Sequence, residues 1–159
     1  MRKNILFLSL LLLLSLVSVS CKRIINKNES KEVILASFTV LADIIRNVAR
    51  DDFIVTSITK PGVEVHGYQP TPSDLVNASS AFVFVDNGFG FELWAEKFVS
   101  NLKVKRITVA EDLDPIFISE DFYKGKPNPH AWISPKRGIL YVDILVDSLS
   151  ELRIQKEII

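Results

Sequence analysis

Short apolar runs alternate with segments of helical periodicity from Glu32 to the end of the chain. Four of these runs are apolar throughout or rich in β-branched residues, which predicts strands of a buried parallel sheet. The predicted strands cover residues 33–36, 53–58, 81–85 and 104–109. Strands that alternate with helices imply an α/β fold with right-handed crossovers, so we expect a parallel sheet with helices on both faces.

Four segments between and after these strands are predicted helices. Residues 41–48 place apolar side chains at helical spacing on one side and polar ones on the other. Ser73 can cap a short second helix, because a serine oxygen accepts hydrogen bonds from the free amides of a first turn. Residues 91–102 form the third, and Ser134 with Pro135 begins the fourth. The apolar positions of this last helix are Ile139, Val142, Leu145, Val146, Leu149 and Leu152.

The first twenty residues follow a different pattern. Arg2 and Lys3 precede an apolar run over residues 5–19, which is shorter than the roughly 20 residues that span a bilayer core. A basic start, a short apolar middle and small residues at the end are typical of a secretory signal. Residues 1–20 are therefore predicted to be a signal peptide.

Cys21 is the only cysteine, and it directly follows this segment in an arrangement that resembles a bacterial lipoprotein signal. Exported proteins that use cysteine structurally tend to have even numbers for disulfides, so we predict that Cys21 is acylated and anchors the chain to a membrane. Ser18 departs from that pattern, because a larger aliphatic residue is usual there. An ordinary signal peptide with an incidental cysteine is the alternative. The polar segment 21–31 is predicted to be a tether to the folded part, 32–159.

Composition narrows the classes of function. The chain has 19 acidic and 19 basic residues, and 48% of its residues are hydrophobic, which fits an ordinary folded protein. No strongly basic face is evident in the sequence, so the usual electrostatic case for a nucleic-acid partner is absent.

The chain has two histidines, His66 and His130, and each lies in a loop that follows a predicted strand. Ligands of parallel sheets bind beyond the carboxyl ends of the strands, so we expect both histidines at the same edge. Prolines stiffen both loops, PGVEVHGYQPTPSD and PNPHAWISP, and neutral imidazole binds zinc, manganese and related ions. We predict that both histidines are metal ligands; a surface or packing role is the alternative.

Two histidines make an incomplete site, because zinc usually takes four ligands. The nearby carboxylates of Glu64, Asp74 and Asp86 each suit an ordinary role, in solvent, in a first helical turn or in a turn of the chain. We therefore expect the remaining ligands to come from outside this chain.

Three residues near the histidines are candidates for supporting the ligands. Tyr68 and Trp132 lie close to the histidines in the sequence, which favours packing around the metal. Asn128 can hold its loop through side-chain hydrogen bonds.

Several segments together resemble a known family. They are ILASFTVLADIIRNV, VTSITKPGVEVHGYQPTPSDL, VDNGFGFELWAEKF and NPHAWISPKRGILYVDIL. The chain is similar, over about residues 32–152, to the zinc- and manganese-type solute-binding lipoproteins of metal ABC importers, which include the streptococcal adhesin-like lipoproteins. The pattern H-x-Y-x-P-[ST]-P-x-D, which begins at His66, and the pattern N-P-H-A-W-x-x-P, which contains His130, are specific in combination.

The resemblance implies a binding protein rather than an enzyme. His66 and His130 would bind zinc or manganese as the transported ion, outside the cytoplasm, for delivery to an ABC permease. Similar proteins have two α/β lobes joined by a long helix, and the second lobe supplies two more ligands. Residues 32–159 would then be the first lobe, ending in the linking helix that begins near Ser134.

On this interpretation the second lobe is absent from the chain. An interrupted gene, a fragment and a free-standing half with a partner are the three explanations, and a non-functional fragment is the alternative to a working receptor. A secreted metallohydrolase is the alternative from another class. It would need a third ligand and a general base, and the sequence has no HExxH pair and no serine in a nucleophile elbow.

Overall fold

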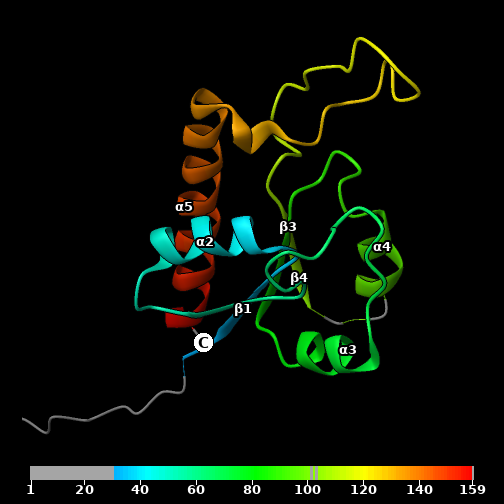
Figure 1. Ribbon diagram of the computed structural model, residues 1–159. Helices are drawn as coiled ribbons and strands as arrows, with labels where there is room; N and C mark the ends of the chain where they lie inside the picture. The colour runs from blue at the N-terminus through cyan, green and yellow to red at the C-terminus, as the bar shows by residue number, and fades with distance from the viewer. Residues whose placement is uncertain (1–30, 101, 103, 159) are drawn as a thin grey trace, which may run out of the picture. The chain divides into compact units, whose positions relative to one another are not determined.

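The computed structural model describes residues 31–100, 102 and 104–158 of the 159-residue chain (Figure 1). The predicted signal peptide, Cys21 and nearly all of the predicted tether lie outside the described residues. Within the described part, no helix has both the length and the apolar character that crossing a membrane requires.

Four parallel strands form one sheet in the order β2-β1-β3-β4. The strands are β1 (Val33–Ala36), β2 (Ile54–Ser57), β3 (Val83–Asp86) and β4 (Lys105–Thr108). Side chains of the two central strands alternate between the faces. Ile34 of β1 packs into one hydrophobic cluster, whereas Leu35 and Phe84 pack into the other. Both faces are apolar because both are covered, which confirms the predicted parallel α/β sheet.

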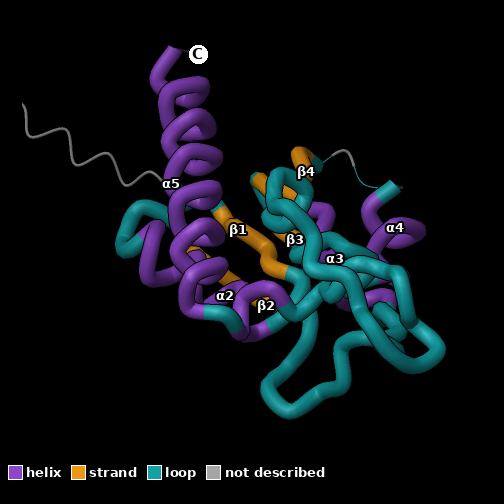
Figure 2. Tube along the Cα trace, turned by 90° about the horizontal axis from the view of Figure 1, so that it is seen from above, coloured by secondary structure: helices purple, strands orange, loops and turns teal. Residues whose placement is uncertain are grey.

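Helices cover the two faces of this sheet (Figures 1 and 2). Two of them, α2 and α5, pack on one face, and α3 and α4 pack on the other. Their bounds are α2 (Thr39–Ala49), α3 (Pro72–Ser79), α4 (Leu93–Val99) and α5 (Pro135–Ile158), and a short 3-10 turn, η1 (Ala131–Ile133), precedes α5. The long segment between β4 and η1 is mostly irregular, and Figure 1 shows it in yellow extending away from the sheet.

The start of α3 differs from the prediction. Thr71, not Ser73, is the N-cap, because its side chain accepts a hydrogen bond from the Asp74 N–H. The Asp74 carboxylate in turn accepts from the Thr71 N–H at 2.7 Å, which completes a capping box. Pro72 then occupies the first turn, where its missing N–H costs nothing. The Ser73 hydroxyl lies 2.8 Å from the Thr71 hydroxyl.

Only part of the apolar face predicted for α5 is buried. The side chains that reach the core are Tyr141, Leu145, Leu149 and Leu152. The predicted positions that remain exposed are Ile139, Val142 and Val146, at 63%, 39% and 44%. Helical spacing predicts which side chains share a face of the helix. How many of them are buried depends on the neighbouring elements that cover that face.

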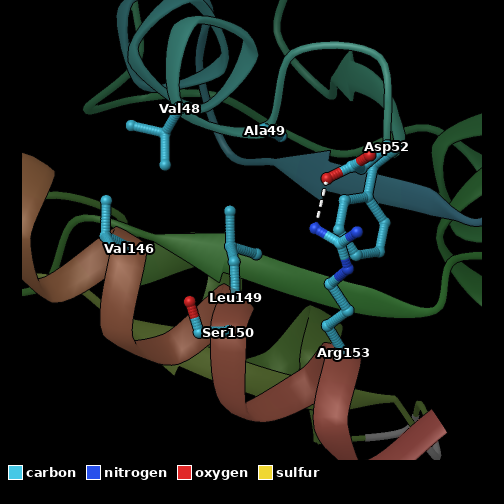
Figure 3. Close-up of a pocket in the computed structure, with 8 residues that line it drawn as sticks. Val48, Ala49, Asp52, Val146, Leu149, Ser150 and Arg153 are labelled. Atoms are coloured by element: carbon cyan, nitrogen blue, oxygen red, sulfur yellow. Dashed lines mark hydrogen bonds and ion pairs between the residues drawn. The ribbon is translucent and has the colours of Figure 1, made fainter. Parts of the chain in front are cut away.

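Helices α2 and α5 meet along a shallow groove (Figure 3). Val48 of α2 faces Val146 and Leu149 of α5 across this groove. At one end, the Arg153 guanidinium donates a hydrogen bond to the Asp52 carboxylate at 2.8 Å. An ion pair thus joins the last helix to the turn that follows α2.

Replacing Arg153 with alanine is expected to lower the free energy of unfolding by less than about 1 kcal/mol. The two side chains are 60% and 52% exposed, so water and salt screen their attraction. Urea denaturation in low and in high salt measures the effect, and Asp52→Ala should produce a loss of the same size that also shrinks in high salt. A loss that does not respond to salt would contradict this assignment.

Candidate metal site

The two histidines come from opposite edges of the sheet and meet beyond the carboxyl ends of its strands. His66 lies in the loop after β2, one edge strand, and His130 lies in the long segment after β4, the other edge strand. The sequence predicted that both would reach the same end of the sheet, and the structure brings them into contact.

The imidazoles approach each other through the same ring atom. The Nε2 atoms of His66 and His130 are 3.3 Å apart, and the ring planes are inclined by 67°. Two nitrogens bound to one tetrahedral zinc ion, each at about 2.0–2.1 Å, would lie about 3.3–3.4 Å apart. The pair therefore has the spacing of two ligands of a single ion.

Asn128 holds the His130 ring. Its Oδ1 accepts a hydrogen bond from the His130 backbone N–H at 3.0 Å and lies 3.1 Å from His130 Nδ1. A proton on Nδ1 is shared with this oxygen, which leaves the Nε2 lone pair free to face His66.

The loop of His66 is held by its own carboxylate. Glu64 accepts hydrogen bonds from the backbone N–H groups of His66 and Gly67, both at 2.7 Å. The Gly67 bond and then the His66 bond lower the pKa of Glu64. On the other side of the loop, the Trp94 indole donates to the Val65 carbonyl at 2.9 Å. These bonds fix the backbone on both sides of the His66 ring.

Aromatic side chains form an apolar wall behind the imidazoles. The Phe91 ring meets His66 at 4.6 Å and His130 at 5.6 Å between centroids, and Trp132 packs 5.3 Å from His130. Partial burial, followed by the proximity of His66, lowers the pKa of His130. This environment favours the neutral imidazole, which is the form that binds metal.

The other residues singled out from the sequence lie in different places. Asn128 and Trp132 contact His130, as described above. The Tyr68 hydroxyl donates to the Asp74 carboxylate at 2.9 Å, and its ring packs on Trp94 rather than on a histidine. The Asp86 carboxylate accepts a hydrogen bond from Arg106 Nε at 2.9 Å.

The candidate carboxylates are therefore engaged elsewhere. Glu64 binds its own loop, Asp74 caps α3, and Asp86 pairs with Arg106. Among the residues that the structure describes, no group of three or more histidine, cysteine and acidic side chains could hold a metal. The described part of the chain thus presents a pair of imidazoles.

Sequence reasoning missed a buried polar cluster under the site. Glu92 is 4% exposed and accepts hydrogen bonds from the Ser37 hydroxyl at 2.6 Å and the Asn87 N–H at 2.8 Å. Burial raises the pKa of Glu92 to about 7. The side chains of Ser37 and Asn87 are also fully buried. The glycine at position 88 indicates the tight turn that leads to Glu92, because its φ is +89°. Nothing in the sequence indicates that the polar groups of this turn are buried.

Comparison with known proteins points to one family. The family model described as zinc-uptake complex component A, periplasmic, matches residues 34–157. The iron-binding protein YfeA of Yersinia pestis is 40% identical over 86% of this chain and 45% of its own length. The manganese ABC transporter substrate-binding lipoprotein scaA of Streptococcus gordonii is 33% identical over 91% of this chain and 50% of its own length.

Solved structures of similar proteins share the fold. The Mn-bound periplasmic metal binding protein from candidatus liberibacter asiaticus superposes with a TM-score of 0.70 and 36% identity, over 77% of this chain and 46% of that one. Zn(II)-bound AdcA from Streptococcus pneumoniae has a TM-score of 0.66 and 28% identity, over 76% and 26% of the two chains.

The family expected from the sequence is thus confirmed. Iron, which the YfeA name includes, was not among the predicted metals. The chain spans about half the length of the curated relatives it matches. Because the family model extends over nearly all of the described residues, this chain belongs to the periplasmic zinc-uptake component A family of metal-transport proteins.

Proposed function

We propose that this chain captures a divalent transition-metal ion outside the cytoplasm as part of a receptor that delivers the ion to an ABC permease. The observation that carries the proposal is the 3.3 Å separation of the His66 and His130 Nε2 atoms, which suits two ligands of one ion. Each ring is backed by an aromatic wall, and His130 is oriented by Asn128.

Zinc and manganese are the ions best supported, with iron as a third. Imidazole suits zinc and iron, whereas magnesium, calcium and manganese prefer oxygen ligands, so the support for manganese comes from the names of relatives. Names of relatives include iron, manganese and zinc. Two imidazoles leave coordination positions for water or for ligands outside the described residues, so selectivity among these ions depends on those additional ligands.

The arrangement favours binding over catalysis. A hydrolytic metal centre needs a metal-bound water together with a general base that can reach it. The acid nearest to His66 in sequence, Glu64, is already bound to two backbone amides of its own loop. Relatives are named as transporter substrate-binding lipoproteins, which agrees with a carrier rather than an enzyme.

The lipoprotein names of relatives also support membrane anchoring for this chain. In this proposal, residues 1–20 are the signal peptide, Cys21 carries the acyl groups and residues 21–31 form the tether. The folded part, residues 32–159, then faces the periplasm or the cell exterior.

Calorimetric titration of the purified chain, kept in detergent, with zinc, manganese and magnesium salts tests the proposal. We expect one zinc or manganese ion per chain, bound weakly, and no binding heat for magnesium. The double variant His66→Ala/His130→Ala is the control, and equal binding by that variant would remove the site from these histidines.

A further inference from the structure

We propose that Asn87 is a positioning residue for His130, and that the Tyr141 hydroxyl extends this control to α5. The inference rests on the proposed function, because it concerns how one ligand of that site is held. Neither side chain lies among the predicted ligands or their predicted neighbours. A continuous chain of hydrogen bonds, buried at Tyr141 and partly buried at Pro129, runs from α5 to the peptide group that precedes the His130 ring.

The Asn87 side chain uses its whole amide. Its Nδ2 donates to the carbonyls of Gly88 and Pro129, both at 2.9 Å, and its Oδ1 accepts from the Tyr141 hydroxyl at 2.6 Å. The residue is fully buried, and Glu92 also fixes its backbone N–H. Because two carbonyls must face the amide nitrogen and a hydroxyl must face the oxygen, only one orientation of this side chain satisfies all its partners.

The Pro129 carbonyl and the His130 N–H belong to the same peptide group, which is planar. Asn87 holds the oxygen of that group at 2.9 Å, and Asn128 Oδ1 accepts from its N–H at 3.0 Å. The side chains of Asn87 and Asn128 therefore bind the two opposite ends of one peptide group. The same Asn128 oxygen also faces His130 Nδ1, so the plane and the ring are oriented together.

Tyr141 carries the connection into α5. Its ring is fully buried in the hydrophobic cluster that α2, α5 and the sheet share, and its hydroxyl donates to Asn87. Burial, followed by the charge of Glu92, raises the pKa of Tyr141, so the phenol keeps its proton and donates it to Asn87. A shift of this turn of α5 therefore moves Asn87, and Asn87 moves the Pro129–His130 peptide.

Groups behind a metal ligand affect binding because they fix its orientation, and their removal typically lowers metal affinity by about 10-fold to 100-fold. We expect Tyr141→Phe to weaken zinc or manganese binding by about 10-fold, because the ring still fills the core while Asn87 Oδ1 loses its donor. Asn87→Asp should weaken it at least as much, because a carboxylate replaces the amide that faces two carbonyls.

The matched control is Ile45→Val, which removes one methyl group from a fully buried side chain of α2. It should lower the melting temperature by about as much as Tyr141→Phe does, and it should leave metal affinity unchanged. In an Asn87→Ala background, Tyr141→Phe should cause no further loss of affinity, because the hydroxyl acts only through Asn87. This cycle separates positioning from a general loss of stability.

A readout without metal completes the experiment. In the metal-free chain, ¹⁵N NMR of the His130 ring should report mainly the Nδ1-protonated tautomer, and Tyr141→Phe and Asn87→Asp should reduce it. If the parent chain binds no metal but the tautomer shifts, the proposed function fails and the positioning role stands. If affinity and tautomer both stay at their parent values while stability falls as in Ile45→Val, the positioning role is wrong.

Discussion

Replacing His130 with alanine is expected to reduce zinc or manganese binding by the chain by about 100-fold or more. Two imidazoles whose Nε2 atoms lie 3.3 Å apart bind one ion together, so the second bond forms at a high effective concentration. Loss of either ring leaves one imidazole, whose bond to the ion competes poorly with water. Calorimetric titration at neutral pH measures the loss.

The two single variants should therefore resemble the double variant. His66→Ala and His130→Ala are each expected to remove nearly all of the binding, with little further loss when combined. Asn47→Ala, which removes an exposed polar side chain from α2, is the control and should bind as the parent does. Losses in the two single variants that multiply to give the loss in the double variant would show that the rings act independently.

The second large effect is a pH dependence of stability caused by Glu92. Relative to a Glu92→Gln variant, the parent chain should lose about 2 to 3 kcal/mol of unfolding free energy between pH 5 and pH 8. Burial raises the pKa of this carboxyl from 4.5 to about 7 in the folded protein. Its contribution is fully present below pH 4.5 and is lost as the pH rises through 7, because the unfolded chain releases the proton first.

Urea denaturation at a series of pH values tests this expectation. Glutamine keeps the size of the side chain, and its carbonyl oxygen can take the place of Oε1, which accepts from both the Ser37 hydroxyl and the Asn87 N–H. Its amide nitrogen then replaces Oε2, which accepts only the longer bond from the Gly88 N–H at 3.2 Å. The comparison uses the difference between the two proteins because the lowered pKa of His130 acts in the opposite direction. Parallel pH profiles for the two proteins would mean that Glu92 is not kept protonated by burial.

The sheet and the position of the histidine pair could be predicted because their signals are local. Residues 33–36 form the strand that their apolar run indicates, with the same bounds, and the alternation of strands and helices predicts the parallel sheet. Each histidine follows a strand, and ligands of parallel sheets bind beyond the carboxyl ends of the strands. This rule was enough to predict that the two rings lie at the same end of the sheet.

The features that were missed depend on tertiary neighbours. Ser73 and Thr71 are both good caps, and Pro72 decides between them by fixing where the first turn begins. Val142 and Val146 have the same spacing as buried residues of α5, but no element of the described chain fully covers them. The polar cluster around Glu92 was also missed, because a sequence does not reveal which carboxylates are buried.

The placement of the histidines on loops from the two edge strands has a mechanical consequence. An ion held by His66 and His130 would cross-link the loop after β2 to the segment that leads into η1, closing a loop of 64 residues that contains β3 and β4. A cross-link of this kind removes conformational freedom from the unfolded chain, and its effect grows with the length of the closed loop. Loading with metal would therefore slow amide exchange most in the buried strands, whose amides exchange only when the whole domain unfolds.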